Sequence, residues 1–290
     1  MRRFAALLLV CVVLFAACAT PALADIGPKP AVYVEFANAE GLEFYATLLS
    51  STPSTGPASA WDGTEGDVRI YSDEPEAREA WEAFAHYEDA DGFYFLQEFW
   101  DCSGGERLEW IYYPPETFKL LLYFPQSGSF RLSPVYSRYA FDSYYTADLG
   151  SSDSGTLSAV RSYDYTWELV SLCARLLLTL AVELALAAAL GYGGRAAFRL
   201  IFVVNAITQT ALNLVLNAVA YFSGSWNFVF AYVLLELAVT ALEAALYVCL
   251  LPQRSGGKGG KGRAALYSVA ANALSFALGL VLARVIPGIF

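Results

Sequence analysis

The chain has 290 residues, of which 57% are hydrophobic, and its mean hydropathy of +0.43 is too high for an ordinary soluble protein. The formal net charge of −10 argues against a nucleic-acid partner, because binding to the phosphate backbone requires a basic surface. The charge is also unevenly distributed: residues 25–166 contain 24 acidic and 8 basic residues, whereas residues 167–290 contain 4 and 8. This asymmetry predicts two domains of different character.

The first 24 residues have the features of a signal peptide. Two arginines open the chain, an apolar run follows, and Ala22-Leu23-Ala24 forms a small-residue cleavage site. A competing interpretation is lipidation at Cys18, for which Phe15 is a poor neighbour. The signal peptide predicts that residues 25–166 are exported across a membrane.

Residues 25–166 predict an extracytoplasmic β-rich, sandwich-like domain with one helix, because short segments of strand-forming residues alternate with turns. The spacing favours an antiparallel arrangement. A helix is expected at residues 76–86 and a long loop at residues 51–66. Strands are expected at residues 31–36, 42–49, 92–100, 108–113, 117–124 and 129–132.

The exported domain offers little that points to catalysis or metal binding. His86 is the only histidine of the chain, so a Ser-His-Asp set is implausible, and neither catalytic residues nor a cofactor is expected. A weak calcium-loop pattern contains Asp89, Asp91 and Glu98, but its first position is Tyr87 instead of a carboxylate. We therefore expect a helix-to-strand turn at this position and no metal site.

Four long apolar runs follow, at residues 167–190, 199–222, 226–251 and 264–286. Each is long enough to cross a bilayer, which takes roughly 20 residues in a helix. Residues 167–290 therefore predict a four-helix transmembrane bundle. The fold class expected for the whole chain is a membrane protein with an N-terminal exported β-rich domain.

The connecting loops predict the orientation of these helices. Basic residues are concentrated in the loops 191–198 and 252–263, whereas the loop 223–225 contains none. Because basic loops remain in the cytoplasm, residues 25–166 and the carboxyl terminus should lie outside. This orientation agrees with the signal peptide, so we expect a multi-pass plasma-membrane protein in contact with the lipid bilayer.

Polar residues recur inside the apolar runs at helical spacing. Four carboxamides stand four residues apart in the second run, which keeps them on one helix face: Asn205, Gln209, Asn213 and Asn217. Counted at about 1.5 Å per residue, the polar groups fall into two layers. The layer nearer the cytoplasm contains Glu183, Asn205, Glu243 and Asn272, and the other contains Arg175, Asn213 and Glu236, with Gln209 between them. The first layer has two carboxylates and no base, which predicts a shared proton or cation.

Several segments resemble a group of uncharacterised Gram-positive bacterial membrane proteins. They are Asp25-Ile-Gly-Pro-Lys-Pro30 after the signal peptide, Tyr112-Tyr-Pro-Pro115, Tyr163-Asp-Tyr-Thr-Trp167 and the amide-rich second apolar run. The resemblance extends over nearly the whole chain. It implies the same topology and no particular activity.

Three functional interpretations remain open. The first is a binding or sensing module for a cell-envelope ligand or another membrane protein, formed by the exported domain and anchored by the helices. The alternative is a small ion- or proton-linked transport protein that uses the buried glutamates and amides. Alternatively, the polar residues serve only to hold the helices together. An enzyme is the least expected class.

Overall fold

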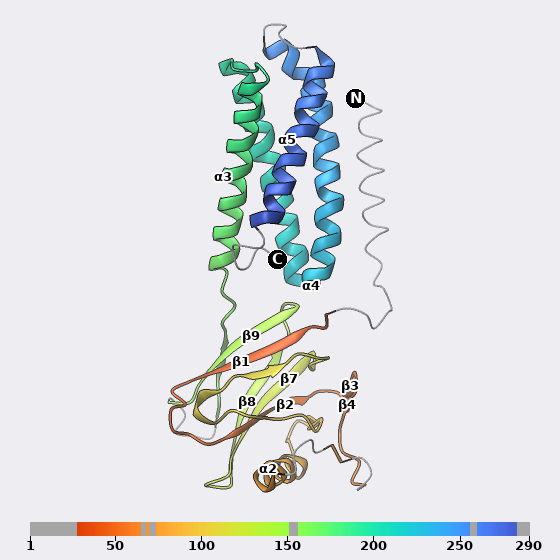
Figure 1. Ribbon diagram of the computed structural model, residues 1–290. Helices are drawn as coiled ribbons and strands as arrows, with labels where there is room; N and C mark the ends of the chain where they lie inside the picture. The colour runs from red at the N-terminus through yellow and green to blue at the C-terminus, as the bar shows by residue number, and fades with distance from the viewer. Residues whose placement is uncertain (1–27, 65–67, 70–73, 151–155, 256–259, 283–290) are drawn as a thin grey trace. The chain divides into compact units, whose positions relative to one another are not determined.

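The structure is a computed structural model that describes residues 28–64, 68–69, 74–150, 156–255 and 260–282. The chain divides into two compact units, a β-rich region at Lys29–Asp164 and a helical region that begins at Tyr165 (Figure 1). The predicted signal peptide, the Cys18 alternative and residues 283–290 lie outside the described residues.

The strands of the β-rich region form two four-stranded sheets and a small hairpin. The first sheet has the strand order β10-β9-β1-β6 and the second β5-β2-β7-β8. One hydrophobic cluster contains side chains from both sheets, including Val34 of β1 and Leu120 of β7. The strands are β1 (Ala31–Ala37), β2 (Tyr45–Ser50), β3 (Ser54–Thr55), β4 (Ala58–Ser59), β5 (Trp100–Asp101), β6 (Leu108–Trp110), β7 (Thr117–Phe124), β8 (Ser129–Ser137), β9 (Asp142–Asp148) and β10 (Ala159–Arg161).

The strand β7 is apolar at nearly every position because both of its faces are covered. Leu120 and Leu122 pack in the cluster that contains residues of both sheets, whereas Leu121 and Tyr123 pack against the helix α2 (Pro75–Ala85). The α2 helix contributes Trp81 and Phe84 to this second cluster. The expected helix at residues 76–86 is thus confirmed.

Three expectations for the β-rich region need correction. The antiparallel arrangement is wrong for β1 and β9, which pair in parallel, because strand spacing along the chain carries no information on a pairing this distant. The strand expected at residues 92–100 is reduced to an isolated bridge at Tyr94 and the short β5. Gln97 interrupts it with a φ of 64°, and its side chain accepts a hydrogen bond from the backbone of Arg69.

The third correction concerns segments that lacked a clear periodic signal. Residues 51–66, expected as a loop, contain the hairpin of β3 and β4. The strands β9 and β10 were not expected from the sequence, although β9 alternates between buried and half-buried positions. Its polar ends at Asp142 and Asp148 obscured the pattern.

The helical region comprises α3 (Thr166–Ala189), α4 (Arg195–Arg254) and α5 (Lys261–Leu282). The α4 helix is interrupted at Gly224, whose φ of 77° and ψ of 176° suit a residue without a Cβ atom. Side chains 35 and 42 residues apart on the two sides of Gly224 are hydrogen-bonded to each other, so the two arms of α4 lie side by side (Figure 1). The break agrees with the predicted turn at residues 223–225.

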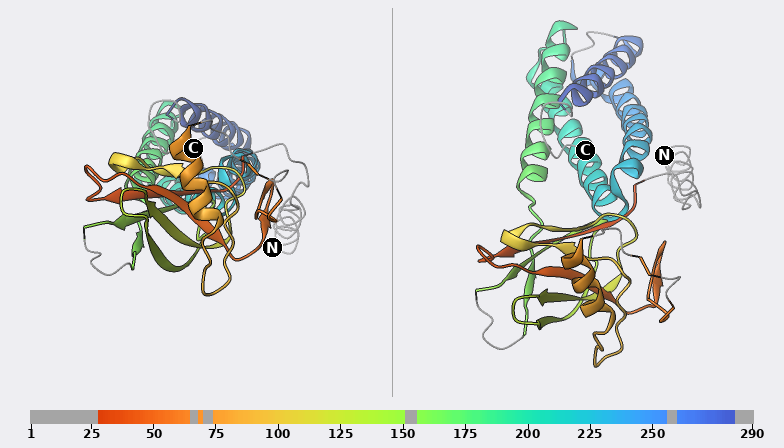
Figure 2. Two further views of the ribbon diagram at one scale, coloured as in Figure 1. Left: turned by 90° about the horizontal axis from the view of Figure 1, so that it is seen from below. Right: turned by 60° about the horizontal axis from the view of Figure 1, so that its bottom comes forward.

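Three helical segments among the described residues are long and apolar enough to cross a membrane: Leu172–Ala189, Arg195–Gly224 and Trp226–Arg254. The α5 helix packs against both α3 and α4, as the views in Figure 2 show. The predicted cytoplasmic loop at residues 191–198 is shorter than expected, because α4 already begins at Arg195.

Candidate functional site

Glu243, on the second arm of α4, is the best-connected acid inside the helical region. It is 0% exposed. Its Oε1 atom accepts a hydrogen bond from the Thr208 hydroxyl, and its Oε2 atom accepts one from Asn272 Nδ2 at 2.8 Å. Both donors are neutral, so the buried carboxylate has hydrogen bonds without a compensating positive charge.

Glu183 of α3 lies beside Glu243 and is also 0% exposed. Its Oε2 atom accepts a long hydrogen bond of 3.4 Å from the Tyr267 hydroxyl. Asn205 faces it from the first arm of α4, and Asn205 Nδ2 donates to the Tyr247 hydroxyl at 2.8 Å. We call Glu183, Asn205, Thr208, Glu243 and Asn272 the acidic cluster.

Several oxygen atoms of the acidic cluster lack a hydrogen-bond partner. Glu183 Oε1, Asn205 Oδ1 and Asn272 Oδ1 are buried and receive no donor. Among the described residues, no lysine, arginine or histidine makes an ion pair with Glu183 or Glu243. Buried acceptors of this kind are rare and call for an explanation. A proton or a small hard cation is the species that such a set of oxygens would bind.

Three tyrosines lie between the acidic cluster and the α3–α4 and α4–α5 connections. Tyr192, Tyr247 and Tyr267 are each 0% exposed. The ring of Tyr267 lies 5.4 Å from that of Tyr247 and 5.9 Å from that of Tyr192, centroid to centroid. We call these residues the tyrosine layer. The sequence offered a signal for one of them, since Tyr247 stands one helical turn after Glu243.

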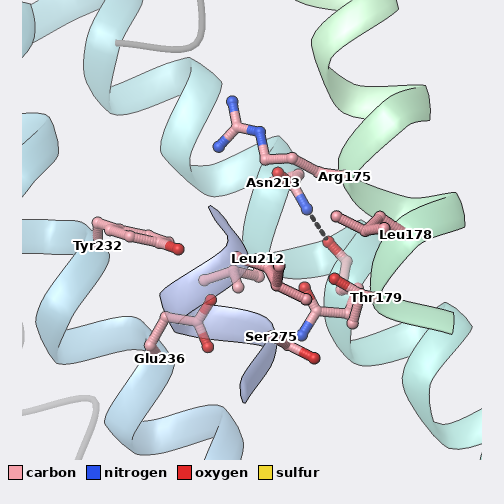
Figure 3. A pocket seen from close by; sticks show the side chains of 10 residues that line it. Arg175, Leu178, Thr179, Leu212, Asn213, Tyr232, Glu236 and Ser275 are labelled. Atoms are coloured by element: carbon pink, nitrogen blue, oxygen red, sulfur yellow. Dashed lines mark hydrogen bonds between the residues drawn. The ribbon is translucent and has the colours of Figure 1, made fainter. Parts of the chain in front are cut away.

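A small polar cavity lies on the other side of the acidic cluster. Its volume is about 20 Å³, which is enough for one water molecule. Figure 3 shows the Tyr232 hydroxyl and the Glu236 carboxylate pointing into it from one side, with Thr179 and Ser275 on the other. The remaining polar lining residues are Arg175, Gln209 and Asn213. We call this space the Arg175 cavity.

The two predicted polar layers are both present in the structure. The structure brings together Glu183, Asn205, Glu243 and Asn272 in one cluster, and Arg175, Asn213 and Glu236 around one cavity, with Gln209 in its wall. Asn217, by contrast, is only half-buried. Thr208, which directly contacts Glu243, was not predicted, although it stands three residues after Asn205 on the same helix face.

In the β-rich region, Asp89 and Asp91 both bind the ammonium group of Lys119, at 2.8 and 2.6 Å. Burial alone would raise the pKa of Asp89, but hydrogen bonds from Lys119 and from the Phe93 backbone outweigh it and lower the pKa. Lys119 therefore lies where the calcium-loop pattern would have placed a cation. Among the described residues, no group of three His, Cys, Asp or Glu side chains is arranged to hold a metal ion.

Glu98, the last residue of the calcium-loop pattern, has a different environment. Burial raises the pKa of its carboxyl group, and Arg69 partly offsets this effect. Neither Asp89 nor Asp91 is among the groups that act on it. The three carboxylates thus do not act as one site.

No family model matches this chain, and neither a curated protein nor a solved structure matches it. The fold itself defines the class: a β-rich region followed by a helical region with three helices of membrane-spanning length and hydropathy. The resemblance to uncharacterised Gram-positive membrane proteins stays a prediction.

Proposed function

We propose that this protein is an ion- or proton-linked membrane protein whose acidic cluster binds and releases a small cation, the proton included. One observation carries the proposal: two fully buried carboxylates share an interior that contains unpartnered oxygen acceptors and no contacting base among the described residues. A negative charge in such a place is costly unless it is neutralised by a bound species.

The alternative, a purely structural role, accounts less well for these residues. Hydrogen bonds between membrane helices contribute only about 0.6–2 kcal/mol each, and amides or hydroxyls provide them without an ionisable group. Asn205 supplies such a bond to Tyr247, whereas Thr208 and Asn272 donate to Glu243 itself. Two additional carboxylates add a large cost of burial and no complementary charge, which favours a functional role.

The topology belongs to the same proposal. We propose that α5 is a fourth membrane-spanning helix of a bundle, that the β-rich region is an exported, sandwich-like domain of a bacterial protein, and that the two basic connections are cytoplasmic. The exposed basic residues near these connections support this orientation: Arg195, Arg199, Arg254, Lys261 and Arg263.

Cysteine labelling in intact cells tests the orientation. The exposed Cys173 and Cys249 are first replaced by alanine. A membrane-impermeant thiol reagent should then label Asn227→Cys near the Gly224 turn and spare Gly193→Cys in the α3–α4 connection. The reverse labelling pattern would reject the proposed orientation.

Infrared spectroscopy of the protein in lipid vesicles tests the cation site. A protonated buried carboxyl group has a distinct carbonyl band, whose intensity should depend on pH or on added sodium in the wild type. Glu183→Gln and Glu243→Gln should each reduce this response, and the double variant should abolish it. Glu82→Gln, at an exposed position of α2 in the β-rich region, is the control. If the band of the double variant responds to pH or sodium as in the wild type, the proposal is refuted.

A second candidate function, binding or sensing by the β-rich region, rests on an aromatic pair on the first sheet. Tyr33 and Tyr144 are stacked at 4.8 Å, and the guanidinium group of Arg107 lies 4.7 Å from the Tyr33 ring. Burial raises the pKa of Tyr144 to about 12, so its hydroxyl remains a donor at neutral pH. Both side chains are half-buried.

Binding of the full-length protein to purified cell-wall fragments tests this second candidate. Tyr144→Ala should weaken binding if the aromatic pair is the contact surface. Tyr94→Ala, an exposed tyrosine near the second sheet, is the control. Equal binding by the two variants and the wild type would reject the aromatic pair as a binding site.

A further inference from the structure

The polar residues of the first arm of α4 continue from Asn205 in one direction only. Along the first arm of α4, the positions one, two and three turns from Asn205 toward Gly224 are all amides: Gln209, Asn213 and Asn217. In the opposite direction, the equivalent positions are Ile201 and Ala197, both apolar and 0% exposed. A proton can pass along hydroxyls, amides and water but not through packed hydrocarbon.

Three residues that line the Arg175 cavity stand one helical turn from residues of the acidic cluster. Thr179 precedes Glu183 by one turn, Gln209 follows Asn205 by one turn, and Ser275 follows Asn272 by one turn. Side chains at this spacing lie about 5–6 Å apart on a helix. Three walls of the cavity are therefore formed by the direct neighbours of the cluster residues.

The cavity also offers the partners that a bridging water requires. A buried water needs two to four polar partners, and the Ser275 hydroxyl is a buried group without a hydrogen-bond partner. The Glu236 carboxylate and the Tyr232 hydroxyl point into the same space (Figure 3). Arg175, only 9% exposed, places a positive charge in the cavity wall that opposes entry of metal cations and leaves proton transfer through water open.

The opposite end of the acidic cluster is closed. The three rings of the tyrosine layer pack together with Ala187, Ala264 and Leu251 in one hydrophobic cluster. All of these side chains are 0% exposed. The titratable groups that interact electrostatically with the carboxylates of the cluster are Glu236 and Tyr247 of α4 and Tyr267 of α5.

We propose that the cation is a proton and that it reaches the acidic cluster through the Arg175 cavity, an inference that rests on the proposed function. The tyrosine layer closes the other end of the cluster. In each transfer, an O–H bond of the cavity water breaks as an O–H bond forms on a carboxylate. A hydronium ion on the Gly224 side protonates the resulting hydroxide and becomes water. Two O–H bonds break and two form, and the net result is the transfer of one proton from the water on the Gly224 side to the carboxylate.

The rate of hydrogen–deuterium exchange at the buried carboxyl groups tests this route. Full-length protein in vesicles is transferred to heavy water, and the shift of the carboxyl band is followed in time. Ser275→Leu fills the cavity and should slow the exchange at least about tenfold. Ala273→Leu introduces the same side chain at an exposed position of the same helix and should exchange at the wild-type rate.

The equilibrium titration of the same band separates this inference from the proposed function. Ser275→Leu should not change the pH dependence of the carboxyl band, because it changes the access of water to the carboxylates and not the carboxylates themselves. If the Ser275→Leu protein does not fold, Ser275→Ala removes only an unpartnered hydroxyl and should slow the exchange about threefold. Exchange at the wild-type rate in the folded Ser275 variants would overturn the proposed route. A carboxyl band that is unchanged by Glu183→Gln and Glu243→Gln would instead overturn the proposed function.

Discussion

The two regions of the molecule treat buried charge in opposite ways. In the β-rich region, the Lys119 side chain is 4% exposed and its ammonium group contacts the carboxylates of Asp89 and Asp91. In the helical region, Glu183 and Glu243 are 0% exposed and accept hydrogen bonds from neutral groups. A buried ion pair contributes little net stability when it forms. It nevertheless holds the fold in one arrangement, because removing either partner leaves an uncompensated buried charge and is strongly destabilising. The carboxylates of Glu183 and Glu243 have no such ionic partner among the described residues, which is the reason that we propose a bound cation.

The largest expected effect comes from breaking the compensated pair. Lys119→Met leaves the Asp89 carboxylate buried without its partner, and we expect the β-rich region to lose about 3–5 kcal/mol of stability. Amide hydrogen exchange along β7, corrected for intrinsic rates, measures this loss. Asp89→Asn in the Lys119→Met background should recover part of it. A loss below about 1 kcal/mol for the single variant would mean that water reaches the pair.

Acid should reproduce that loss without a mutation. Because the pKa of Asp89 is lowered in the folded protein, its contribution is present above the unfolded carboxyl pKa of about 3.9 and is lost as the pH falls through the lower native value. The pKa of Lys119 is raised, so its contribution persists up to about pH 10. The protection of β7 should thus be constant between about pH 5 and 9 in the wild type. A transition inside that window would contradict the assignment.

A smaller effect is expected in the helical region. Asn272→Ala removes one of the two neutral donors of Glu243, and we expect about 1–2 kcal/mol of destabilisation in thermal unfolding in detergent. Asn227→Ala is the control, since Asn227 is exposed and bonds only to the backbone of Ser223. Equal effects of the two substitutions would show that Glu243 gains nothing from its amide partner.

The smallest effect should come from the exposed ion pair of the first sheet. Arg107 and Glu109 contact each other, but their side chains are 40% and 44% exposed. Glu109→Gln removes this ion pair and leaves Arg107 beside the Tyr33 ring, so it should change the stability of the β-rich region by less than about 0.5 kcal/mol. When this variant and Lys119→Met are measured by the same exchange method, the difference between their losses of stability shows the effect of burying an ion pair. A loss comparable to that of Lys119→Met would refute this explanation.

Local patterns in the sequence determined much of this protein. The amide row of α4, the break at Gly224 and the largely apolar run of β7 all follow from local sequence patterns, which depend on neighbours along the chain. The two polar layers were predictable for the same reason, since depth along a helix is a matter of counting residues. These features need no knowledge of distant contacts.

Only the tertiary structure decided which distant groups meet. The parallel pairing of β1 with β9 and the binding of Asp89 to Lys119 join segments that no local pattern connects. The tyrosine layer likewise draws one residue each from a loop, α4 and α5. Periodicity determines which face a side chain occupies, but the packing of the whole chain selects its partner, and here that selection separates a compensated charge from an uncompensated one.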